Sequence, residues 1–79
     1  MVEVFKTNVH EEQQAKALLG VIHKTCVNYK ATFDLDDCDK ILRIQCDYGS
    51  VHSSIITNIL LEYGYFSEVL EDEVVEVRN

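Results

Sequence analysis

Two alternating runs joined by an aspartate-rich turn occupy residues 29–46, YKATFDLDDCDKILRIQC. Apolar and polar side chains alternate from Tyr29 to Asp36, and they alternate again from Ile41 to Cys46. Successive side chains on a strand point to opposite faces, so each run predicts a half-buried strand. The polar turn between them completes the pattern of a β-hairpin.

A helical pattern lies on each side of this hairpin. Apolar residues recur at steps of three and four from Ala15 to Cys26, and again from Val51 to Tyr63. This spacing predicts two helices, each with one buried stripe. Gly20 lies inside the first pattern and suggests close packing against the sheet. Gly64 directly follows the second pattern and predicts a helix end with positive φ.

Short strand-like runs flank the two helices: Val2 to Thr7 lies before the first helix, and Tyr65 to Leu70 follows the second. The order is therefore βαββαβ, which predicts an α+β, ferredoxin-like sandwich. Right-handed crossovers place both helices on one face of a four-stranded antiparallel sheet with strand order 4-1-3-2. We expect one domain over residues 1–72. Residues 73–79 form an acidic, valine-rich tail, which either pairs as an extra strand or is disordered.

The composition of the chain limits which classes of partner and which cell compartment we expect. The chain has 79 residues, three cysteines and a formal net charge of −7. This charge repels phosphate backbones and anionic lipid, so we expect neither nucleic acid nor a membrane as partner, whereas a basic partner would be attracted. An odd number of irregularly spaced cysteines does not indicate a disulfide framework. We also expect no signal peptide at residues 1–7 and no apolar run long enough to span a bilayer. We therefore predict a cytoplasmic protein.

Several positions share the spacing of one known family. They are Phe33, Leu35, Leu42 and Ile44 in the hairpin and Ile56, Leu60, Gly64, Tyr65, Ser67 and Val69 beyond it. In this respect residues 2–70 resemble the heavy-metal-associated domains, which are small ferredoxin-like carriers of copper, zinc or mercury. In that family a Met and two Cys three apart lie between the first strand and the first helix. Here Val9 falls at the Met, and Glu11 and Gln14 fall at the two Cys. The resemblance thus implies the fold without the metal motif.

Other candidate sites are sparse. His10 and Glu11 form the only pair of a nitrogen and an oxygen ligand near the family's metal loop, and two ligands bind a metal weakly. The aspartates from Asp34 to Asp39 do not match a calcium loop, which requires Gly at its sixth position and Glu at its twelfth. Ser53 and Ser54 follow His52, but neighbouring helix positions do not face each other. We therefore predict no enzyme activity and no cofactor.

The sheet face away from the helices is the best candidate for a binding surface. In the expected register its outward apolar residues are Val2, Val4, Ile41, Phe66 and Leu70. Exposed apolar patches of this kind often mark partner sites. Two alternatives stay open: the valine-rich tail covers the patch, or the register is shifted by one residue. The sequence therefore favours a non-catalytic module that binds an unknown protein or a second copy of itself. The alternative is a weak carrier of a metal ion or small ligand that uses the loop between the first strand and first helix.

Overall fold

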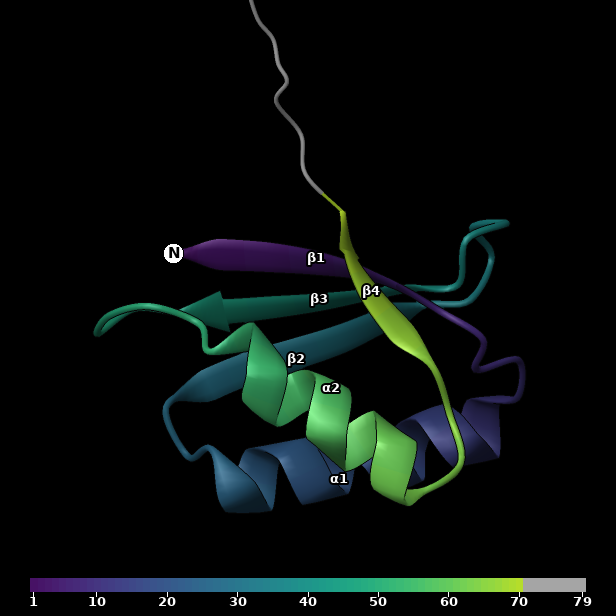
Figure 1. Cartoon of the computed structure of the whole chain (residues 1–79), viewed down its shortest axis with the longest axis horizontal. Coiled ribbons are helices and arrows are strands. Elements are labelled where there is room, and N and C mark those ends of the chain that lie inside the picture. The colour runs from purple at the N-terminus through teal and green to yellow at the C-terminus, as the bar shows by residue number, and fades with distance from the viewer. Residues whose placement is uncertain (71–79) are drawn as a thin grey trace, which may run out of the picture.

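The six predicted elements are all present in the computed structural model, which describes residues 1–70 (Figure 1). Their bounds are β1 (Val2–Thr7), α1 (Glu12–Thr25), β2 (Tyr29–Asp34), β3 (Ile41–Cys46), α2 (Ser53–Glu62) and β4 (Ser67–Leu70). The α+β order is thus confirmed. The end of the predicted domain at residue 72 and the predicted tail strand lie outside the described residues.

The four strands form one antiparallel sheet in the order β2-β3-β1-β4, which is the predicted order 4-1-3-2 counted from the other edge. Both helices lie on one side of this sheet, where they contact each other (Figure 1). Strands β1 and β3 are central, and β2 and β4 are the two edges. No described element covers the second side of the sheet, which we call the open face.

The core lies between the helices and the sheet. Alternate strand residues face it, among them Phe5, Leu42 and Ile44, so the predicted inward and outward faces hold and a one-residue shift is excluded. Its largest fully buried side chains are Phe5, Val9, Leu18, Ile22, Leu42, Ile44, Ile56 and Leu60. Burying such side chains supplies most of the favourable free energy available to a domain of this size.

Two predicted strands are shorter than expected. Strand β2 ends at Asp34 because the chain then enters a turn, in which the Lys40 Nζ donates to the Leu35 carbonyl at 2.8 Å. Strand β4 begins at Ser67, since the Tyr65 N–H still donates to the Leu60 carbonyl of α2 at 2.8 Å.

The two glycines with sequence-based expectations behave differently. Gly64 has a φ of +85°, as predicted for the residue that ends α2. Gly20 is exposed, and a Cβ at its position would meet no atom within 4 Å. The expectation that Gly20 packs closely on the sheet is therefore wrong. Residue 20 is two positions from both Leu18 and Ile22, which is about 200° around the helix and away from the buried stripe.

Candidate functional site

The open face is a mixed surface of charged, polar and apolar side chains. Its middle row, read across the four strands, is Thr32, Arg43, Val4 and Leu70. On one side of this row lie Asp34, Ile41, Lys6 and Glu68, and on the other lie Lys30, Gln45 and Val2. The face thus carries cations in its interior although the chain as a whole is acidic.

Four of the five residues predicted for the partner surface are open to solvent to some degree. Val2 and Phe66 are 50% and 58% exposed, and Val4 and Leu70 are half-buried. Ile41 is only 8% exposed, so its assignment to an exposed patch is wrong. It belongs to the central strand β3, where neighbours on two adjacent strands surround an outward side chain.

The apolar residues on the open face do not form one patch. Val4 pairs with Leu70, whereas the Phe66 N–H donates to Asn8 Oδ1 at 2.7 Å, beyond the end of the ladder. Lys6 and Glu68, which are opposite each other in the ladder, lie between them. Four residues of extended chain separate Leu70 from Phe66, which corresponds to about 13 Å. The expected contact between Val4 and Phe66 is therefore absent.

Ion pairs occur at the two ends of the open face. Lys6 Nζ lies 3.7 Å from the Asp39 carboxylate, and Lys30 Nζ lies 3.6 Å from that of Asp47. A hydrogen bond from the Gln45 amide, followed by the charge of Lys30, lowers the pKa of Asp47 below its usual value. Both pairs are largely exposed, so each contributes little to stability. Arg43, in the middle row, has no ion pair within residues 1–70.

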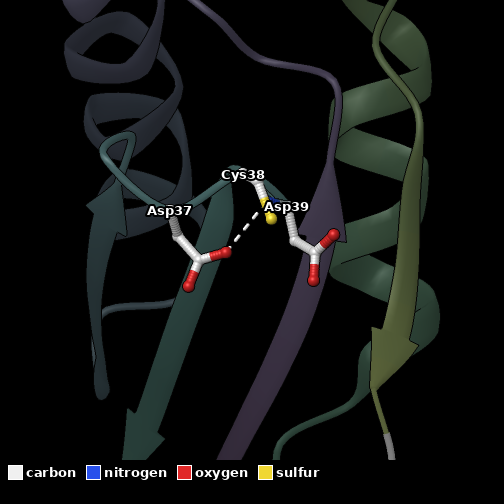
Figure 2. A group of neighbouring side chains, drawn as sticks. All are labelled: Asp37, Cys38 and Asp39. Carbon is white, nitrogen blue, oxygen red and sulfur yellow. Dashed lines mark hydrogen bonds between the residues drawn. The ribbon is translucent and has the colours of Figure 1, made fainter.

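The candidate metal ligands His10 and Glu11 do not form a site with three or more ligands in the described chain. His10 and Glu11 are both exposed in the loop before α1, and no third ligand of the described chain groups with them. The one group of three potential ligands in residues 1–70 is Asp37, Cys38 and Asp39, whose ligand atoms lie within 4.8 Å of one another (Figure 2).

This hairpin group already has structural roles. The Asp39 N–H donates to Asp37 Oδ1 at 2.9 Å, which is the bond drawn in Figure 2, and the Asp39 carboxylate pairs with Lys6. Such side chain to backbone bonds are typical of aspartates in turns. All three cysteines are free, and partial burial raises the pKa of the Cys26 thiol. These features describe a well-formed turn and do not by themselves make a metal site.

One buried polar side chain has no hydrogen-bond partner within the described part of the chain. Ser67 is opposite Thr7 across the β1–β4 ladder, on the helix side of the sheet. Thr7 Oγ1 donates to the Lys40 carbonyl at 2.6 Å and accepts from the Val9 N–H at 3.2 Å. Ser67 Oγ makes no hydrogen bond to any described residue.

A groove of about 290 Å3 runs between α1 and the edge strand β2, and sequence reasoning did not find it. We call it the α1–β2 groove. Its apolar residues are Ala15, Leu19, Phe33 and Leu35, and its charged ones are Glu12, Lys16, Asp34 and Asp36. The sequence did contain a signal: Glu12, Lys16, Leu19 and His23 recur at helical spacing beside the core stripe.

His23 continues this helix face to the other end of β2. Its Nε2 accepts a hydrogen bond of 3.0 Å from the Ala31 N–H. That bond requires an unprotonated Nε2, so the neutral ring carries its proton on Nδ1. A side chain thus satisfies a backbone donor on an edge strand, a position that would otherwise be open to another strand.

No family model, curated protein or solved structure matches the chain. Within residues 1–70, neither helix is long and apolar enough to cross a bilayer. The functional argument therefore rests on the surfaces described above.

Proposed function

We propose that the chain is a cytoplasmic, non-catalytic interaction module that binds another protein through its β-sheet. In this proposal the fold is ferredoxin-like, and it is similar to the heavy-metal-associated domains without their thiolate ligands. The βαββαβ order and the strand order β2-β3-β1-β4 support this fold. Three free cysteines support a reducing compartment.

The observation that carries the proposal is the asymmetry of the sheet. One side packs on both helices, whereas the described residues leave the open face uncovered and give each edge strand a strand neighbour on one side only. The uncovered surface holds exposed Val2 and Phe66, together with Arg43, which forms no ion pair within residues 1–70. Aromatic and arginine side chains are the types most enriched in protein interfaces.

The alternative, a weak metal carrier, has less support. His10 and Glu11 supply at most two ligands and no thiolate, whereas structural zinc sites use four ligands and copper(I) selects soft thiolate or thioether ligands. A zinc titration followed by amide NMR separates the two functions. Saturable shifts confined to residues 8–14 at micromolar metal would favour the carrier and contradict the proposal.

Site-specific photo-crosslinking in the native cell tests the interaction module. A photoreactive amino acid is placed at Thr32 or Glu68, which are exposed on the open face, and at Ala17 or Asn58, which are exposed on the helices. We expect discrete crosslinked products from the first pair alone. The mass of the product distinguishes a second copy from a different protein.

Two outcomes would contradict the proposal. One is crosslinking from the helix positions alone, which would move the interface to the other side of the molecule. The other is the absence of products at all four positions, which would leave the sheet without a partner. Matched amide spectra of the four variants show whether each substituted chain is folded.

A further inference from the structure

Strand β2 has a free edge, on which one backbone N–H has no partner among the described residues. Residues of an antiparallel edge strand direct their N–H and C=O groups alternately toward the neighbouring strand and toward the free edge. Because the Ala31 N–H bonds to His23 rather than to β3, the free-edge set is Tyr29, Ala31 and Phe33. The Tyr29 N–H donates to the Cys26 carbonyl at 3.0 Å. The Phe33 N–H has no partner among the described residues.

The α1–β2 groove lies directly beside this free edge. Leu19, Phe33 and Leu35 are half-buried there, and each packs against the core while part of its surface stays open. A strand added to β2 would point alternate side chains into the groove and the others to the open face. The groove's volume of about 290 Å3 accommodates one large apolar side chain of such a strand.

The charges that line the groove favour particular residues next to the apolar side chain of the incoming strand. Glu12, Asp34 and Asp36 line the groove against a single cation, Lys16. The whole chain carries a formal charge of −7, which disfavours a second copy as the occupant. Lysine or arginine near the apolar residue would be attracted to these three carboxylates.

His23 occupies the place of an incoming carbonyl oxygen. Its Nε2 accepts from the Ala31 N–H at 3.0 Å, which is the bond that an added strand would make with the same donor. The side chain is exposed and lies at the end of the groove-lining face of α1, so it can rotate away without disturbing the core. In the free protein this contact protects the edge from indiscriminate pairing.

We propose that the α1–β2 groove binds an extended protein segment that pairs with β2 as an added strand, places one apolar side chain in the groove and carries Lys or Arg next to it. This inference rests on the proposed interaction function and names the chemistry of the partner. The incoming strand displaces His23 from Ala31 and supplies a partner for the Phe33 N–H.

A phage library of random peptides, each about nine residues long, is the probe for this site, because strands rarely exceed that length. Selection against the full chain should enrich an apolar residue flanked by Lys or Arg. A synthetic peptide with the enriched sequence should shift the amides of Leu19, Ala31, Phe33 and Leu35. Failure to enrich any motif, or shifts confined to the amides of Val4, Arg43 and Leu70, would overturn the inference.

Backbone methylation of the same peptide separates strand addition from side-chain binding. Methylating one N–H at a time should weaken binding about tenfold at every second position, where the N–H faces β2, and should have little effect between them. Uniform sensitivity, or none, would contradict strand addition. The two sets of methylated peptides have the same side chains and serve as controls for each other.

Variants of the protein locate the contact. Leu19→Gln should weaken peptide binding about tenfold, whereas Leu61→Gln, on the exposed side of α2, should not. His23→Ala frees the Ala31 N–H and should strengthen binding about threefold. Equal or weaker binding by this folded variant would contradict displacement of His23. If the peptide experiments fail while Thr32 and Glu68 still crosslink, the partner uses the open face, and only this inference is lost.

Discussion

Leu60 provides the sharpest test of the packing on which both proposals depend. Its side chain is 0% exposed and belongs to the core between α2 and the sheet. Truncation to Ala removes three carbons from this core, which corresponds to about 2–3 kcal/mol of transfer free energy. The cavity left behind brings the expected loss to about 2–5 kcal/mol. A domain of this length has a total stability of only about 4–12 kcal/mol, so the expected loss is a large fraction of the whole.

Leu61 is a matched control at the next position of the same helix. It is 55% exposed, and Leu61→Ala should therefore lose less than about 1 kcal/mol. Both residues accept backbone bonds at the end of α2: Leu60 from Tyr63 and Tyr65, and Leu61 from Gly64. Alanine retains those carbonyls and changes helix propensity equally, so the difference between the two variants reports burial alone.

Urea denaturation followed by far-UV circular dichroism measures both losses. The slope of unfolding free energy against urea should stay constant while the midpoint falls, which identifies a change in stability rather than in compactness. A loss below about 1 kcal/mol for Leu60→Ala, or equal losses for both variants, would refute the assignment of Leu60 to the core.

Three further results are expected. Gly64→Ala should destabilise the domain by about 1 kcal/mol, because the φ of +85° at this position disfavours a Cβ. Gly20→Ala should instead stabilise it by up to about 1 kcal/mol, because a Cβ at this position of α1 meets open space. Urea melts in which both variants change stability in the same direction would contradict this. Ser67→Ala should leave stability unchanged or raise it in the same melts, because it removes a buried hydroxyl that has no hydrogen-bond partner within residues 1–70. The Asp47 pKa should lie below the usual aspartate value in a carboxyl NMR titration, and Gln45→Ala should raise it; an unchanged pKa would rule out the amide hydrogen bond as its main cause. Folding lowers the pKa of Asp47, so the ionised carboxylate stabilises the folded state slightly. This contribution is fully present above the pH range in which an ordinary aspartate titrates. It is lost as the pH falls through the lowered pKa.

The sequence alone determined the order of the elements and most of the residues that face the core. Alternation around the hairpin assigned Leu42 and Ile44 to the core, and helical spacing assigned Ile56 and Leu60 to it. These assignments succeed because periodicity is local: a strand repeats every two residues and a helix every 3.6, whatever lies opposite. The strand order followed from the right-handedness of the two crossovers.

Only the tertiary structure decided which residues are neighbours across strands. Alternation is unchanged when one strand slides past another by two residues, so the sequence placed Val4 and Phe66 on the correct face but could not pair them. The ladder pairs Val4 with Leu70 and leaves Phe66 beside Asn8. The bond between His23 and Ala31 likewise depends on how α1 is set against β2. The α1–β2 groove also depends on how α1 packs against β2, and no local sequence pattern encodes that packing.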